Sequence, residues 1–263
     1  MLENLVGRYI NVKGKYVYLE EYGRGLPIVL IHLAGFDGRI YHDVVKYFPT
    51  DKYRLLLLDL PGHGKSEPWE VQLKGLSNAS VSFYSDVIME LANALNLERF
   101  IAVGTSVGGD IVLDLSTKAK KLIAGVAANC AARTRTFSEE DVKNAINTDP
   151  ARTLFFASPN ATKSLIERLT WIRSSTRNEI LRWDLAAWNS FDIADKLELI
   201  RIPLLLLRGE YDPIVTHDMM KSTAEKIKSA RFKELKGAGH YAPAENPELY
   251  AKEVIQFLEE NFK

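Results

Sequence analysis

Ser106 lies at the centre of a Gly-Thr-Ser-Val-Gly segment, residues 104–108, whose spacing suits a reactive hydroxyl. The segment directly follows an apolar run at residues 100–103 and precedes a helix-compatible run at 111–115. A sharp strand-to-helix turn needs small residues two positions before and after the serine, because larger ones would clash in the strained backbone. The helix that begins there points its free N–H groups at any negative charge that develops. The motif therefore predicts a nucleophilic Ser106, and a chance match of small turn residues is the alternative.

A serine hydroxyl is a poor nucleophile without a base, and His240 is the best candidate for that base. It lies in a Gly-Ala-Gly-His segment after an alternating stretch at residues 231–235, which indicates the last strand. A loop at this point places the imidazole over the carboxyl edge of a sheet. The alternative is an ordinary surface-loop histidine.

Asp212 is the expected acid that orients the base and stabilises its protonated form. It follows the apolar run 204–207, and the order Ser106, Asp212, His240 is the one expected for a triad built on such a turn. Glu210 is a nearby competitor. The other place for the acid, after the preceding strand at residues 127–130, contains no carboxylate.

The elements that must position these residues alternate between strands and helices. Short apolar runs at 27–31, 55–58, 100–103 and 204–207 are typical of parallel strands covered by helices on both faces. Residues 7–22 indicate a hairpin, residues 84–97 an amphipathic helix, and Asn246 with Pro247 the start of a final helix. The pattern predicts an α/β fold with a doubly wound, mostly parallel sheet.

One region, residues 131–190, interrupts this rhythm because it contains no convincing strand. We expect it to be a helical cap inserted in a core domain formed by residues 1–130 and 191–263. The region is rich in large aromatic residues, which either pack onto the core or line an apolar pocket under a cap. They are Phe155, Phe156, Trp171, Trp183 and Trp188.

Composition narrows the classes of function. The 263 residues contain 34 Lys and Arg and 34 Asp and Glu, so nothing indicates a nucleic-acid or polybasic membrane surface. The single cysteine, Cys130, excludes an intrachain disulfide. No signal-peptide pattern or membrane-spanning run is present, which predicts a cytoplasmic protein. We expect the protein to be a monomer or a homodimer. The five histidines show no metal-ligand spacing and no phosphate loop occurs, so we expect neither metal nor cofactor.

At these residues the chain resembles the α/β-hydrolase fold family, in its capped serine esterase-like branch. The resemblance covers nearly the whole length and includes the Asp-Leu-Pro-Gly-His-Gly-Lys-Ser segment at 59–66 and the residues around Gly239 and His240. It implies structural roles for Asp59 and His63, with a catalytic role for His63 as the alternative. Dehalogenases and epoxide hydrolases of this fold use an aspartate where this chain has Ser106.

The resemblance also implies an oxyanion hole formed by the backbone N–H groups of Ala34 and Val107. Leu33 replaces a glycine that the family usually has after His32, which alters the expected backbone path. Asp110, in the first turn of the helix after Ser106, could oppose an oxyanion.

We therefore expect a serine hydrolase that cleaves a small, largely uncharged carboxylic ester or lactone through an acyl-enzyme. One alternative is a hydrolase of carbon–carbon bonds in diketone-type substrates. Another is a weakly catalytic, ligand-binding protein, and a third is a lyase or acyltransferase on the same scaffold.

Overall fold

The computed structural model describes residues 5–133 and 137–262, and within them one mixed sheet forms the centre of the molecule. Strands β3 to β8 run parallel to one another, while β1 and β2 are antiparallel additions at one edge. The doubly wound, mostly parallel sheet expected from the sequence is confirmed. In spatial order the strands are β1 (Val6–Val12), β2 (Lys15–Gly23), β4 (Tyr53–Leu58), β3 (Leu26–Ile31), β5 (Phe100–Thr105), β6 (Leu122–Ala128), β7 (Leu204–Gly209) and β8 (Ala230–Leu235).

The four apolar runs all form strands, and the expected hairpin is β1 and β2, which turn at Lys13 and Gly14. Strand β6 gives a weaker apolar signal in the sequence because alanine and glycine make up most of it. The central strands are fully buried because helices cover both faces of the sheet.

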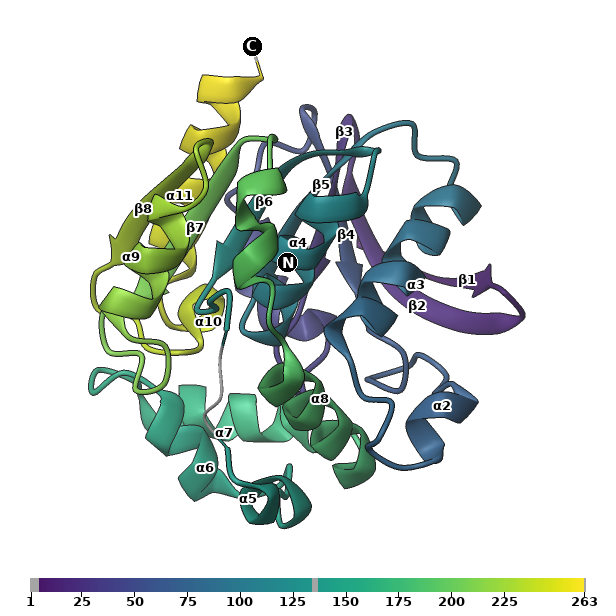
Figure 1. Ribbon diagram of the computed structural model, residues 1–263, viewed down its shortest axis with the longest axis vertical. Helices are drawn as coiled ribbons and strands as arrows, with labels where there is room; N and C mark the ends of the chain where they lie inside the picture. The colour runs from purple at the N-terminus through teal and green to yellow at the C-terminus, as the bar shows by residue number, and fades with distance from the viewer. Residues whose placement is uncertain (1–4, 134–136, 263) are drawn as a thin grey trace.

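Helices α3, α4 and α9 lie in front of the sheet in Figure 1, and α11 lies behind it. Helix α3 begins at Val81, three residues earlier than expected, because the Ser80 hydroxyl accepts a hydrogen bond from the Phe83 N–H and caps it. Asn246 caps α11 in the same way, as the sequence predicts. The helices that pack around the sheet or connect its strands are α1 (His42–Val45), α2 (Glu70–Leu73), α3 (Val81–Ala94), α4 (Val107–Lys118), α9 (His217–Glu225), α10 (Ala242–Glu245) and α11 (Pro247–Asn261), with the 3-10 helices η1 (Gly38–Tyr41) and η2 (Ala194–Leu199).

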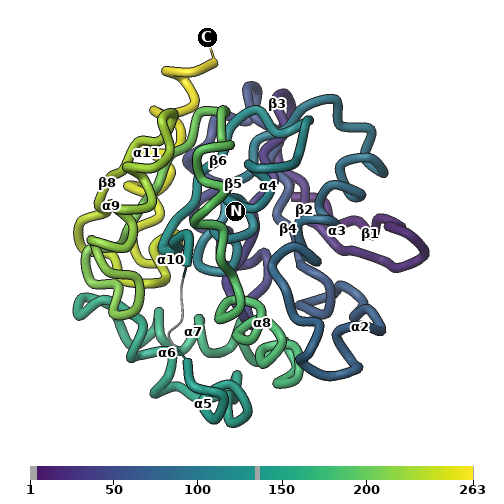
Figure 2. Tube along the Cα trace, viewed as in Figure 1, coloured from purple at the N-terminus to yellow at the C-terminus, as the bar shows by residue number. Residues whose placement is uncertain are grey.

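The chain between β6 and β7 forms a separate helical layer. It contains α5 (Glu139–Lys143), α6 (Pro150–Phe156), α7 (Lys163–Arg173) and α8 (Asn178–Ser190). Figure 1 shows these helices grouped at one end of the sheet, and Figure 2 shows the chain returning from α8 toward β7. We call this layer, α5 to α8, the helical cap; the boundaries of a cap at residues 131 and 190 stay a prediction.

Candidate active site

Ser106 lies in a sharp turn between β5 and α4. Its φ of 58° and ψ of −125° are strained for a residue with a side chain. A Cβ added to Gly104 would lie 2.1 Å from the Gly108 carbonyl oxygen, and one added to Gly108 would lie 2.3 Å from the Ile31 carbonyl oxygen. The two glycines that flank the serine are therefore required by the close approach of neighbouring backbone.

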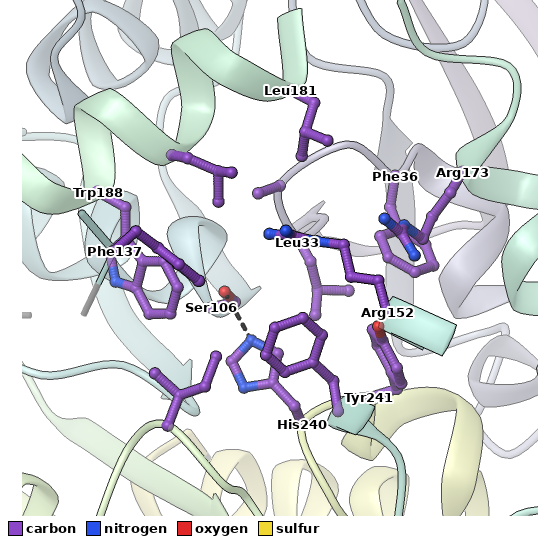
Figure 3. Close-up of a pocket in the computed structure, with 14 residues that line it drawn as sticks. Leu33, Phe36, Ser106, Phe137, Arg152, Arg173, Leu181, Trp188, His240 and Tyr241 are labelled. Atoms are coloured by element: carbon purple, nitrogen blue, oxygen red, sulfur yellow. Dashed lines mark hydrogen bonds between the residues drawn. The ribbon is translucent and has the colours of Figure 1, made fainter. Parts of the chain in front are cut away.

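The structure brings Ser106, His240 and Asp212 together at the carboxyl ends of β5, β8 and β7. The Nε2 atom of His240 lies 2.9 Å from the Ser106 Oγ, and its Nδ1 lies 2.8 Å from the Asp212 Oδ2 (Figure 3 shows the first of these contacts). The other oxygen of Asp212 accepts hydrogen bonds from the N–H groups of Ile214 and Val215. All three side chains are buried. The Asp212 carboxylate can accept the proton on the His240 Nδ1, which leaves the His240 Nε2 to face the serine hydroxyl.

Glu210, the competing acid, points elsewhere. Its carboxylate accepts a hydrogen bond from the Gly237 N–H at 2.9 Å and pairs with Lys236 at 3.2 Å. These two contacts hold the pKa of Glu210 below its usual range. Geometry therefore assigns the contact with His240 to Asp212 and leaves Glu210 to stabilise the turn after β8.

Asn129 joins the loops that carry the acid and the base, and its role was missed in the sequence. Its Oδ1 accepts from the Gly209 N–H at 2.7 Å, and its Nδ2 donates to the carbonyl oxygens of Gly239 and His240. Asn129 sits at the end of β6 with a left-handed φ of 49°, a conformation that asparagine tolerates better than most residues. The only signal in the sequence was an amide at the alternative place for the acid, after the strand that precedes β7.

We expect Asn129→Gly to lower the free energy of unfolding by about 2–4 kcal/mol, because three buried polar groups lose their partner. Glycine accepts the same φ, so the loss reflects the hydrogen bonds rather than backbone strain. Activity should fall at least about tenfold as the two loops lose registration. Urea denaturation and ester kinetics check this, with Asn96→Gly as the control, because Asn96 is exposed and has a left-handed φ of 53° close to that of Asn129. Equal stability of Asn129→Gly and wild type would contradict the assigned role.

The base is also tied to the helical cap. The His240 N–H donates to the Phe156 carbonyl oxygen at 2.9 Å, and Glu245 accepts from the N–H groups of Ser158, Gly239 and Tyr241. A Cβ on Gly239 would lie 2.6 Å from the Ser158 nitrogen, so the backbone of the cap passes directly over this glycine. The Gly-His pair noted in the sequence is thus a packing requirement of the cap.

The peptide between Leu33 and Ala34 is held in one orientation by His32. The Nδ1 of His32 lies 2.8 Å from the Leu33 carbonyl oxygen, and its Nε2 accepts from the Leu60 N–H. Because a trans peptide is planar, the N–H of Ala34 points away from that carbonyl. Leu33 has no left-handed φ, so the absence of a glycine there does not strain the backbone.

Ala34 lines the pocket that contains Ser106, and Val107 begins the helix after it. Within residues 5–133 and 137–262, neither backbone N–H has a hydrogen-bond acceptor. Burial raises the pKa of Asp110 well above its ordinary value, which favours the neutral form of this side chain over a carboxylate that would oppose an oxyanion. The two features of the sequence that argued against an oxyanion hole, Leu33 and Asp110, are therefore compatible with one.

Asp184, from α8 of the cap, holds the same loop from the other side. Its Oδ2 accepts from the Gly35 N–H at 2.9 Å and from His63 Nε2 at 2.8 Å, while its Oδ1 accepts from the Tyr84 hydroxyl at 2.5 Å. The nearby Asp184 carboxylate outweighs burial and raises the pKa of His63. His63 therefore connects the 59–66 segment to the cap and does not line the pocket that contains Ser106.

The buried His32 should make stability depend on pH. Burial, and then the positive charge of His63, lower the pKa of His32 from 6.5 to about 3. Below pH 6.5, His32 binds a proton in the unfolded chain but stays neutral in the folded protein. Protonation therefore favours the unfolded chain, and the contribution of His32 to the free energy of unfolding is lost as the pH falls. Relative to His32→Gln, the wild type should lose about 2 kcal/mol of unfolding free energy between pH 6.5 and 5.

Urea denaturation of both proteins at the two pH values measures this difference. The comparison is needed because burial raises the pKa of Asp59 to about 6, which acts in the opposite direction in both proteins. Parallel pH dependence of wild type and His32→Gln would show that His32 is not held neutral.

Ser106 and His240 open into a small pocket between the core and the helical cap. Of the five aromatic residues singled out in the sequence, Phe156 and Trp188 line it, together with Phe137; Trp183 is buried but outside the lining, and Phe155 and Trp171 are more than half exposed. Two arginines that carry no local sequence signal, Arg152 and Arg173, also line the pocket. Their presence does not agree with the expected largely uncharged substrate.

The sheet, the strained serine turn and the buried contacts of His240 define a class of α/β protein built around a serine, a histidine and an aspartate. A sequence model of the α/β-hydrolase fold matches residues 27–169 and 170–247. The chain therefore belongs to the α/β-hydrolase fold family, as the resemblance implied.

Similar proteins carry several hydrolase names. The chain is 24% identical to a pimeloyl-[acyl-carrier protein] methyl ester esterase of Legionella pneumophila, over 92% of this chain and 99% of that protein. It is 22% identical to a 2-hydroxy-6-oxo-6-(2'-aminophenyl)hexa-2,4-dienoic acid hydrolase of Metapseudomonas resinovorans, over 96% and 91% of the two chains. The enol-lactonase of Burkholderia xenovorans LB400 shares the fold, with a TM-score of 0.82, 23% identity and coverage of 96% and 100%.

Across the described ranges, no helix combines the length and apolar character that a membrane span requires. In the same part of the chain, no three side chains of His, Cys, Asp or Glu gather in a way that could hold a metal ion.

Proposed function

We propose that this protein is a serine hydrolase that cleaves a small carboxylic ester or lactone through an acyl-enzyme. The observation that carries the proposal is the bridging position of His240, within hydrogen-bond distance of both Ser106 and Asp212. A pure binding protein has no chemical need for all three groups in this geometry.

In the first step, the Ser106 Oγ attacks the carbonyl carbon while its proton passes to the His240 Nε2. Asp212 keeps the Nδ1 proton in place and stabilises the imidazolium. The oxyanion receives hydrogen bonds from the N–H groups of Ala34 and Val107. His240 then returns the proton to the leaving oxygen, and the acyl group stays on Ser106.

In the second step, His240 takes a proton from water as the water oxygen attacks the acyl carbon. His240 then returns the proton to the Ser106 Oγ while the bond to the acyl carbon breaks, which releases the acid and regenerates both residues. The names of the relatives support an acyl substrate, because they include an ester, a lactone and an enol keto acid. The last of these supports carbon–carbon bond hydrolysis as the second candidate, which uses the same three residues.

A fluorophosphonate probe tests the nucleophile. We expect the probe to label Ser106 of the folded protein at one equivalent, and 4-nitrophenyl esters of graded chain length to be hydrolysed. Absence of labelling would favour the ligand-binding alternative, whereas labelling without hydrolysis across esters, lactones and diketones would favour a lyase or acyltransferase.

A further inference from the structure

Two arginines of the helical cap line the pocket that contains Ser106. Arg152 comes from α6 and Arg173 from the last turn of α7. Figure 3 shows the side chain of Arg152 extending into the cavity toward Ser106, and that of Arg173 over the ring of Phe36. An apolar pocket for an uncharged ester has no need for two guanidinium groups, so these side chains require an explanation.

Neither arginine forms an ion pair with a described residue. Arg173 is 2% exposed, and its guanidinium contacts only uncharged oxygens, those of the Thr153 hydroxyl at 2.7 Å and the Asp149 and Ile146 carbonyls at 3.5 and 3.4 Å. Arg152 lies 5.4 Å from the ring centres of both Phe137 and Phe156. Two cations that share a pocket without an anion are costly to bury.

The nearest acid does not neutralise them. The carboxylate of Asp149 accepts a hydrogen bond from the Ala151 N–H and caps α6, and it lies too far away for an ion pair with either arginine. The pocket lining itself contains no Asp or Glu. Burial lowers the pKa of both guanidinium groups, and repulsion from Arg173 lowers that of Arg152 further, but arginine remains protonated at neutral pH.

A third donor faces the same part of the pocket. The hydroxyl of Tyr241 lies close enough to Arg152 and Arg173 for both cations to act on its pKa, although burial raises that pKa overall. In the part of the chain that the structure describes, this hydroxyl has no hydrogen-bond partner. Figure 3 shows Tyr241 beside Arg152, with its hydroxyl directed toward the cavity.

We propose that Arg152, Arg173 and Tyr241 form a subsite for a carboxylate of the substrate, so that the ester or lactone cleaved at Ser106 belongs to an acid. Planar guanidinium groups bind a planar carboxylate through paired, charge-assisted hydrogen bonds, and the phenol supplies one more. The anion replaces the missing counter-charge of the two arginines. The small size of the pocket places the carboxylate within a short acyl chain of the scissile carbonyl.

The inference rests on the proposed function and names its substrate class. Matched pairs of 4-nitrophenyl esters test it: the monoesters of succinic, glutaric and adipic acid against the esters of butanoic, pentanoic and hexanoic acid. The two members of a pair differ in charge but not in leaving group or number of acyl carbons. We expect the best anionic ester to exceed its neutral partner at least about tenfold in kcat/KM after subtraction of spontaneous hydrolysis.

Arg152→Gln should lower the ratio of kcat/KM for that anionic ester to kcat/KM for its neutral partner by about 10- to 100-fold, mainly through KM for the anionic ester. Tyr241→Phe should act in the same direction with a smaller effect. Arg177→Gln is the matched control, because Arg177 is an exposed arginine of the same cap, outside the pocket lining. If wild type and Arg152→Gln hydrolyse both members of every pair equally well, the carboxylate subsite is refuted while the hydrolase remains.

Binding of adipate alone separates failure of the subsite from failure of the hydrolase. We expect millimolar adipate to raise the Tm of wild type and Arg177→Gln by about 2 °C, but not that of Arg152→Gln. The same result in a protein that hydrolyses no ester would retain the anion subsite and overturn the proposed function. Stabilisation by inorganic phosphate but not by adipate would overturn the assignment to a carboxylate.

Discussion

Replacing Ser106 with alanine should lower kcat for the best ester by about 10⁴- to 10⁶-fold, because the acyl-enzyme can no longer form. Activity that remains would come from water attack on a substrate still bound near the oxyanion donors. The fold should survive, since alanine has a smaller side chain and the loss of one hydroxyl does not alter the strained backbone at φ 58°. Steady-state kinetics and circular dichroism measure both effects.

The control for this experiment is Ser82→Ala, which removes a serine hydroxyl that bonds to Asp114 far from the pocket. It should keep wild-type kinetics. Comparable activity in Ser106→Ala and wild type would show that another residue is the nucleophile.

Asp212→Asn should lower kcat about 10⁴-fold with little change in structure. The N–H groups of Ile214 and Val215 both donate to the Asp212 Oδ1, so the amide oxygen of asparagine takes that position. Its NH₂ then faces the His240 Nδ1 and donates to it. This contact favours the tautomer with a proton on Nε2, which cannot accept the proton of Ser106.

Glu210→Gln is the matched control for that prediction, because it makes the same change of carboxylate to amide two residues earlier. Its partners are Lys236 and Gly237, so we expect kcat within about threefold of wild type. A severe loss in Glu210→Gln with near-normal activity in Asp212→Asn would reverse the assignment of the acid.

The elements around the site were predictable because each carries a local signal. Buried parallel strands are continuous apolar runs, and the turn at Ser106 needs glycines at fixed distances. Both signals lie within a few neighbouring residues. The order of Ser106, Asp212 and His240 adds a constraint that a single sequence also carries.

The lining of the pocket was less predictable because it depends on contacts between distant segments. Arg152 and Arg173 carry no local sequence signal for a pocket, and only tertiary packing brings them into the lining beside Ser106. Trp171 and Phe155, which looked equally suitable for a pocket, instead face solvent. Asn129 escaped notice for a related reason, since its partners lie 80 to 111 residues away along the chain.

The hydrogen bond from the His240 N–H to the Phe156 carbonyl has a consequence for engineered chimeras in which the cap is exchanged. A transplanted cap whose backbone does not place a carbonyl oxygen beside the His240 N–H would leave the base without one of its supports, even if every residue of the core were unchanged. Residues 156–158 belong to the cap in sequence, but their contacts make them part of the support of His240. A chimera that keeps residues 156–158 and exchanges the helices on either side preserves this support of His240.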